Sequence, residues 1–227
     1  MNCWICGQSA DSAEHLVKVS DLRGLFGRVS QERLLYLHSS ATRNVPKRTV
    51  HDSAFKSKAL LCSRCNNALT QPYDRAWECL SANLRARKSL LVGEVINMRK
   101  VFKQPVREAL LDTHLYFVKL FGCRIVENQV PIEIAQFADA LRNRKPHPDV
   151  YIAIGPSPFG AGRARIAGLS EIHGVNFGGR CIYATWLYHV GNLAVNVIYT
   201  EPGQHRVGLT RAWHPDTTSH FIKMNRL

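Results

Sequence analysis

The chain has 227 residues, 45% of them hydrophobic, which is too apolar for a disordered chain and enough for the core of one large domain or two modest ones. Its formal net charge is +13 and its sequence pI is about 9.7, values that are unusual for an enzyme acting on small neutral molecules. We therefore expect a polyanionic partner, nucleic acid above all, with a merely basic surface as the alternative.

The N-terminal sequence and the hydropathy pattern predict neither export nor membrane insertion. No apolar run reaches the roughly 18 residues that can span a bilayer, and the segment MNCWICGQSA has no basic stretch followed by an apolar one. We expect a cytoplasmic protein with no membrane partner. In that reducing compartment the seven cysteines favour metal ligation or free thiols over disulfides.

Four of the cysteines form two pairs with the spacing of a structural zinc site. Cys3 and Cys6 lie in CWIC, and Cys62 and Cys65 lie in CSRC. Each pair can turn two thiolates toward one ion, and Zn²⁺ suits a closed, tetrahedral sulfur shell. Chance pairing of buried cysteines and a thiol-exchange site are the alternatives. The other cysteines lie in apolar surroundings and are expected in the core: Cys79, Cys123 and Cys181.

The 55 residues between the two pairs are too many for the loop of a simple zinc finger, so they form an insertion. The insertion holds an acidic residue directly before a histidine, Glu14-His15, and a further histidine, His51. Basic side chains around this dipeptide would attract phosphates. The cations expected to contact nucleic acid are Lys18, Arg23, Lys56, Lys58, Arg64, Arg75 and Arg85.

Taken in order, CWIC, the dipeptide EH and the segment ALLCSRCNN resemble the zinc-stapled branch of the HNH endonucleases. The resemblance covers residues 1–92 and rests on the order of pieces that are weak when taken singly. It implies a ββα-metal core, in which a hairpin and one helix grip a divalent cation. The first domain would then be an HNH nuclease-like zinc domain over residues 1–103.

The resemblance also implies roles for three residues. His15 would be the general base that takes a proton from the attacking water, and Glu14 and Asn66 would bind a catalytic Mg²⁺ or Mn²⁺. A histidine with its ordinary pKa can be neutral near pH 7, and hard oxygen ligands suit Mg²⁺. The expected reaction is hydrolysis of phosphodiester bonds in DNA, with RNA as substrate and a homodimer left open.

The sequence departs from the family pattern at two positions. Ser57 stands where a central asparagine is usual, so we expect the loop there to be held differently. No histidine follows CNN on the next helix, which leaves His51 as a further candidate for a metal ligand or a phosphate contact. Asn66 and Asn67 are adjacent, and either could instead cap the helix that follows.

Apolar spacing predicts three helices. The first lies in DRAWECLSANLRARKSLLVG (74–93), with Trp77 in the core, basic residues on the outer face and Gly93 at its end. The second lies in PVREALLDTHLYFVKLFGCRIV (105–126), and the third in PIEIAQFADALRN (131–143), which begins with a proline.

Segments rich in β-branched and aromatic residues predict an antiparallel sheet after these helices. Gly191-Asn192 suits a tight hairpin turn, and residues 155–164 are interpreted as a hairpin connection because they lack the lysine and serine of a phosphate-binding loop. The fold class is therefore α+β, with an accessory domain over residues 104–227. The predicted strands are DVYIAIG, GRARIAGLS, RCIYATWLYHV and NLAVNVIYT.

Two classes of function remain. Residues 1–105 carry a net charge of +9 and the rest of the chain +4, so the nuclease-like half is the more basic one. The first class is a metal-dependent HNH endonuclease in a bacterial or phage defence or mobile-element setting, whose second domain recognises a target, a partner or a ligand. The second is a noncatalytic, zinc-stapled module that binds nucleic acid. The scattered histidines of the second half receive no role.

Overall fold

The structure is a computed structural model that describes residues 2–159, 165–206, 209, 211–217 and 219–227. Near its N-terminus, a short strand pairs in antiparallel fashion with a strand that lies about forty residues later, and a helix follows the second strand. These elements are β1 (Ser12–His15), β4 (Lys56–Leu61), the π-helical turn η2 (Arg64–Leu69) and α2 (Gln71–Arg85). The insertion between β1 and β4 contains α1 (Val19–Phe26), β2 (Leu35–Leu37), β3 (Val45–Lys47) and η1 (Ser53–Phe55).

Helix α2 starts earlier and ends earlier than the predicted span of 74–93. Pro72 lies in its first turn, where a missing backbone N–H costs no hydrogen bond. Trp77, Leu80 and Leu84 are fully buried, but the helix stops at Arg85. Residues 91 and 92 are exposed, so a longer helix would gain little packing there. The predicted end at Gly93 is therefore wrong.

The second half begins with two helices, as the apolar spacing predicts. Helix α3 (Val106–Glu127) is buried on nearly all sides and lies at the centre of the molecule. The elements around it are β5 (Val95–Asn97), which pairs with β11 (Phe221–Lys223), the turn η3 (Met98–Lys100), and α4 (Ile134–Arg142).

An antiparallel sheet covers α3. Its strand order is β6-β10-β9-β7, and β8 also pairs with β9. The hairpin predicted at Gly191-Asn192 is confirmed, because Val190 pairs with Leu193 and Gly191 has a φ of 58°. The bounds are β6 (Val150–Pro156), β7 (Ala167–Leu169), β8 (His173–Phe177), β9 (Arg180–Val190) and β10 (Leu193–Thr200).

Two strand predictions need correction. Residues 155–164 do not join paired strands, because β6 pairs with β10 whereas β7 pairs with β9. The predicted strand in GRARIAGLS shortens to β7, and residues 160–164 lie outside the described residues. Strand β8 was not predicted from the sequence; all five of its side chains are exposed, so it lacks the buried alternation that marks a strand.

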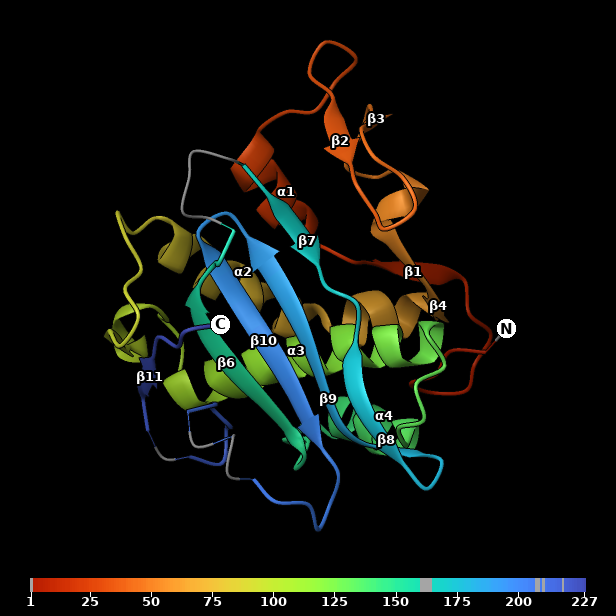
Figure 1. The fold of residues 1–227 in the computed structure, drawn as a ribbon, viewed down its shortest axis with the longest axis vertical. Helices are drawn as coiled ribbons and strands as arrows, with labels where there is room; N and C mark the ends of the chain where they lie inside the picture. The colour runs from red at the N-terminus through yellow and green to blue at the C-terminus, as the bar shows by residue number, and fades with distance from the viewer. Residues whose placement is uncertain (1, 160–164, 207–208, 210, 218) are drawn as a thin grey trace.

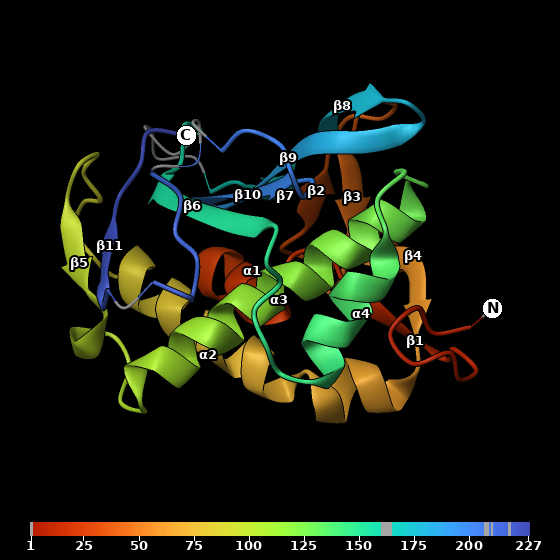
Figure 2. The ribbon, with the colours of Figure 1, turned by 90° about the horizontal axis from the view of Figure 1, so that it is seen from below.

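The elements stack in layers that join the two halves of the chain. In Figure 1 the sheet lies in front of the helices, and Figure 2 shows α3 between the sheet and α2. Trp77 of α2 stacks on Tyr116 of α3, with ring centroids 5.5 Å apart, and contacts Tyr188 of β9 edge-on. Truncating such a buried indole costs about 3–5 kcal/mol.

One hydrophobic core runs from Cys3 to Met224 and crosses the predicted boundary between residues 103 and 104. That boundary falls just before α3, and nothing separates its two sides into independent cores within the described residues. No helix of the described residues is long and apolar enough to cross a membrane. The fold is therefore a mixture of helices and small antiparallel sheets built on a shared core.

Candidate functional site

The four paired cysteines converge at the open end of the β1–β4 pair. Their Sγ atoms all lie within 4.8 Å of one another, and those of Cys6 and Cys62 are 3.5 Å apart. The first pair lies on a turn in which the backbone N–H of Gly7 donates to the carbonyl of Cys3, and Gly7 has a φ of 78° that favours glycine. In the second pair, Cys62 follows β4 directly and Cys65 lies in η2.

This cluster could hold a zinc ion. Four thiolates around one centre match the closed ligand set of a structural zinc site, and the turn geometry at both pairs brings them together without a disulfide. Within the described residues it is the one group of three or more His, Cys, Asp or Glu ligand atoms close enough to share an ion. The predicted role of Cys3, Cys6, Cys62 and Cys65 thus agrees with their placement.

His15 is the last residue of β1 and lies beside the insertion. It pairs across the strands with Lys56, and the register shifts between Ala13 and His15. Its side chain is half-buried, and its Nδ1 atom is buried with no hydrogen-bond partner among the described residues. The ring of His51 lies 5.7 Å from the ring of His15, centroid to centroid, so the insertion brings the two predicted histidines together.

The surroundings of His15 favour its neutral form. Burial is the largest cause, and the nearby charges of Lys56, His51, Lys18 and Arg23 add to it, so that the pKa of His15 falls from 6.5 to about 4. A neutral imidazole near pH 7 can accept a proton. The residue therefore has the protonation state that a general base requires.

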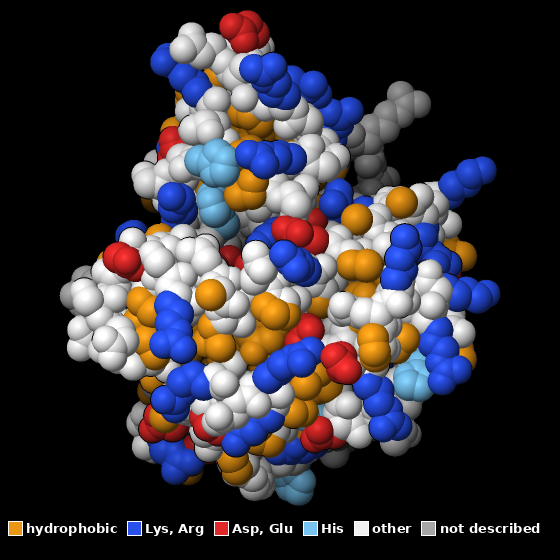
Figure 3. Space-filling model, turned by 180° about the vertical axis from the view of Figure 1, so that it is seen from behind, with side chains coloured by type: hydrophobic (Ala, Val, Ile, Leu, Met, Phe, Trp, Pro, Cys, Tyr) orange, Lys and Arg blue, Asp and Glu red, His pale blue; other side chains and the backbone are white. Residues whose placement is uncertain are grey.

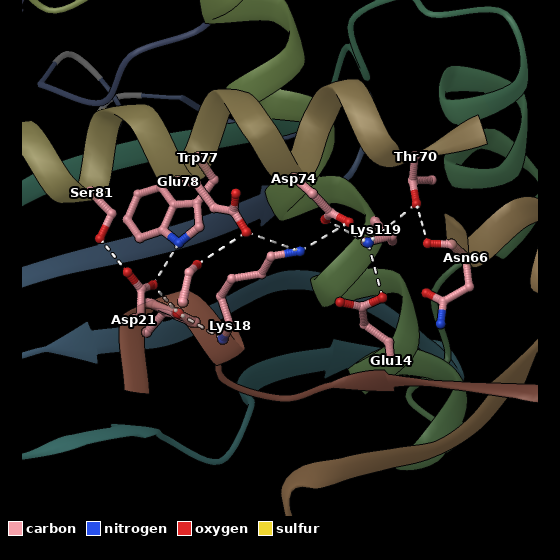
Figure 4. A network of polar contacts seen from close by, with 12 residues as sticks. Glu14, Lys18, Asp21, Asn66, Thr70, Asp74, Trp77, Glu78, Ser81 and Lys119 are labelled. Carbon is pink, nitrogen blue, oxygen red and sulfur yellow. Dashed lines mark hydrogen bonds and ion pairs between the residues drawn. The ribbon is translucent and has the colours of Figure 1, made fainter. Parts of the chain in front are cut away.

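Glu14 points away from this histidine, into the interior, as successive residues of a strand do. Its Oε2 atom accepts a hydrogen bond from Nζ of Lys119 at 2.9 Å (Figure 4). Lys119 comes from the middle of α3, is fully buried, and also donates to Oδ1 of Asp74 at 2.8 Å and to the hydroxyl of Thr70 at 3.2 Å. The carboxylate predicted to bind the catalytic ion is therefore held in a buried ion pair.

Charge complementarity maintains this buried pair. Burial alone would lower the pKa of Lys119, but the carboxylates of Glu14 and Asp74 more than offset it, and the pKa lies above its usual range. Burial raises the pKa of the Glu14 carboxyl, and attraction to Lys119 opposes that effect. The ammonium group thus holds two carboxylates from different elements, β1 and α2.

Figure 4 shows that the polar network continues along α2. Lys18 bridges Asp74 and Glu78, with Nζ–carboxylate distances of 3.1 and 3.6 Å. The buried carboxylate of Asp21 accepts hydrogen bonds from four partners, which fix α1 against α2 and β9. These partners are Trp77, Ser81, Arg85 and Tyr188.

The adjacent residues Asn66 and Asn67 differ in their burial. Asn66 is buried and its Nδ2 donates to the hydroxyl of Ser12 at 2.8 Å, whereas Asn67 is exposed. The Oδ1 atom of Asn66 is buried and has no hydrogen-bond partner among the described residues. Neither asparagine is the N-cap residue of α2, which is Thr70.

Ser57 is buried and ties β4 to α3. Its hydroxyl donates to Glu127 at 3.1 Å and accepts from the backbone N–H of Ala59, also at 3.1 Å. Ser57, which was expected in a loop, therefore lies in strand β4 and is held by a hydrogen bond to α3.

The cations predicted to contact phosphates differ in whether other side chains already bind them. Lys18 and Arg85 are engaged by buried or half-buried carboxylates, so they are poorly placed to bind phosphates. Arg23 contacts Nε2 of His51 at 3.0 Å. Lys56 is half-buried beside His15. The cations with exposed side chains are Arg23, Lys58, Arg64 and Arg75.

A pocket of about 430 Å³ lies next to the paired histidines. Its polar lining consists of Arg23, Arg28, Thr49 and His51, and Gly27, Val29 and Val50 complete it. Figure 3 shows Lys and Arg side chains gathered over the lobe that contains β2 and β3, with histidine side chains at its base. The pocket offers positive charge and space beside His51, which suits an anionic group.

The residue that the sequence reasoning missed is Lys119. A lone cation inside the apolar run LYFVKLFG signals a buried charge, since a lysine is rarely surrounded by apolar residues unless it is paired. The pattern could not reveal its partners, because Glu14 lies 105 residues away in the chain.

Comparison with protein-family models, with curated proteins and with solved structures finds no match to this chain.

Proposed function

We propose that the protein is an HNH-type endonuclease that hydrolyses phosphodiester bonds of nucleic acid, with DNA as the first substrate to test. The observation that carries the proposal is the placement of a neutral, half-exposed His15 at the end of a strand pair that four cysteines join to α2. Cys3, Cys6, Cys62 and Cys65 would hold the structural zinc, which fixes the strand ends and the start of the helix.

In this proposal His15 takes a proton from the attacking water. Nδ1 is buried and His51 lies against the ring, so the imidazole has little freedom to turn away. Arg23 and the pocket beside it would hold the phosphate through charge-assisted hydrogen bonds. Together these residues would supply a general base and a positively charged binding site for the phosphate.

The ligand set expected for a catalytic Mg²⁺ or Mn²⁺ does not fit as predicted. Asn66 offers an unpartnered Oδ1 atom, but the carboxylate of Glu14 is committed to Lys119. Divalent ions therefore enter the proposal as a condition to be tested and not as part of the chemical step.

The test is nicking of supercoiled plasmid by zinc-loaded protein, with Mg²⁺, with Mn²⁺ and with a chelator too weak to remove the zinc. Wild type should nick, and His15→Ala should lose about 100-fold or more of the rate, as removal of a general base does. His38→Ala is the matched control, since His38 is an exposed histidine of the same insertion. Nicking by His15→Ala at the wild-type rate would contradict the proposal.

A second function is favoured by one observation, the buried Glu14–Lys119 ion pair. If that pair replaces a metal site, the protein is a noncatalytic, zinc-stapled module that binds nucleic acid. It would then bind DNA equally well with or without His15 and would not cut it under any divalent ion.

A further inference from the structure

A second groove, away from the paired histidines, is lined by positive charge. It has a volume of about 700 Å³ and lies between α2 and the segment 99–104 that follows β5. Arg75 contributes from α2, and Arg99, Lys100 and Lys103 contribute from the opposite side. All four cations are exposed.

The charge of this groove is not neutralised by its own walls. No acidic residue lines it within the described part of the chain. Two cations near the other face of α2 are paired in contrast: Lys18 bridges two carboxylates, and Arg85 is held by Asp21. Four like charges facing one open space repel one another, so the groove gains most from an anion that carries several charges.

The shape of the groove is set by rigid elements. Arg75, Cys79 and Asn83 are spaced four residues apart, so they form one stripe along α2. The opposite wall is anchored by the buried residues Val101 and Phe102, which lie in sequence between Lys100 and Lys103. A firmly held, elongated wall of positive charge suits a polymer backbone with repeating phosphates better than a single compact anion.

We propose that this groove binds the sugar-phosphate backbone of a nucleic acid, outside the segment that His15 would cut. The choice of nucleic acid as the polymer rests on the proposed function. Helix α2 links the two places, since its N-terminal end follows the turn that carries Asn66 and its outer stripe lines the groove. The groove would hold the substrate by charge and would not read its sequence.

The test is the salt dependence of binding, measured in the His15→Ala background so that no substrate is consumed. Lys100→Gln/Lys103→Gln should weaken binding and lower the slope of log Kd against log salt concentration by about 2, one for each lost phosphate contact. Arg142→Gln/Arg165→Gln is the matched control, because it removes two exposed cations that do not line the groove. Equal slopes for the two double variants would overturn the proposal.

The probes are labelled duplex DNA, single-stranded DNA and duplex RNA of one sequence. A slope change with any of these probes supports backbone binding, and its size in each identifies the preferred polymer. Because binding is measured without turnover, a protein that binds through the groove but never nicks plasmid would contradict the proposed nuclease and leave the groove intact.

The reactivity of the Cys79 thiol reports whether the groove is occupied, without any substitution of its cations. Its thiol lies in the groove wall, half-buried, and near Lys103. Alkylation of the peptide that contains Cys79 should slow several-fold when duplex DNA is bound to the zinc-loaded protein. An unchanged rate at saturating DNA would contradict occupancy of the groove.

Discussion

The four-cysteine cluster and the Glu14-His15 site were predicted from the same sequence resemblance. In the structure, the cysteines converge as predicted, whereas Glu14 and His15 do not. The four Sγ atoms converge within 4.8 Å, whereas the two members of the dipeptide point in opposite directions, one toward His51 and one toward Lys119. A closed metal site needs only its own ligands and turns. An open catalytic site depends on what the rest of the fold places against it.

That difference has a physical basis. Two CxxC turns are local structures, and one ion satisfies all four thiolates at once. A strand residue faces whichever element packs on its side, and here the packing element is α3, which brings a fully buried ammonium group.

Replacing one zinc ligand should have the largest effect. Cys62→Ser should abolish zinc binding and the cooperative melt of the strand pair, because structural zinc contributes about 10 kcal/mol or more to small zinc domains. Zinc stoichiometry and the melt followed by circular dichroism measure both. Cys79→Ser is the control, since Cys79 lies outside the cluster. A Cys62→Ser protein that keeps its zinc and its melt would show that the cluster is not a structural metal site.

Removing the buried ammonium group of Lys119 should have the second largest effect on stability. Lys119→Met leaves Glu14 and Asp74 with no buried cation between them, and we expect a loss of about 3–5 kcal/mol in the free energy of unfolding. Urea denaturation measures it. Adding Glu14→Gln to Lys119→Met should recover part of the loss, because one uncompensated charge is removed. Additive losses would mean that the two residues do not interact.

The acid limb of the pH–rate profile reports on His15. Its pKa of about 4 means that the neutral, proton-accepting form persists well below the usual 6.5. Nicking should therefore be half-lost near pH 4, and a midpoint near 6.5 would contradict the assigned surroundings of His15. Because the unfolded chain binds this proton near 6.5 and the folded chain only near 4, stability also falls over that range. A melt at each pH separates the two effects.

The smallest effect is expected at Ser57. Ser57→Ala removes the hydrogen bond from β4 to Glu127, and the loss should be about 1 kcal/mol in the free energy of unfolding. Ser89→Ala, at an exposed position, should change stability very little. Equal values for the two variants, measured by urea denaturation, would show that this hydrogen bond does not hold the strand pair to α3.

Much of the fold could be predicted from local sequence. The helices over residues 105–126 and 131–143 nearly match α3 and α4, and the hairpin at Gly191-Asn192 is present, because apolar spacing and turn residues act locally. The end of α2 and strand β8 could not be predicted. The first depends on where packing stops, and the second has no buried side chain to mark it.

Less of the site could be predicted. The cysteine spacing predicts the cluster, and the contact between His51 and His15 follows a weak expectation about the insertion. The partners of Glu14 and Arg85 could not be predicted, because Lys119 and Asp21 approach them from distant parts of the chain. Cys79 was expected in the core but is half-buried in a groove wall, since its helix faces a basic segment that the apolar pattern does not describe.

The proposed function requires that His15 acts in cutting and not in binding. The most direct measurement determines Kd for duplex DNA and the single-turnover nicking rate on the same zinc-loaded samples of wild type, His15→Ala and His38→Ala. We predict equal Kd values for all three proteins and a loss of about 100-fold or more in rate for His15→Ala alone. A His15→Ala protein that cuts as wild type does, or a wild type that binds but cuts with neither Mg²⁺ nor Mn²⁺, would contradict the claim.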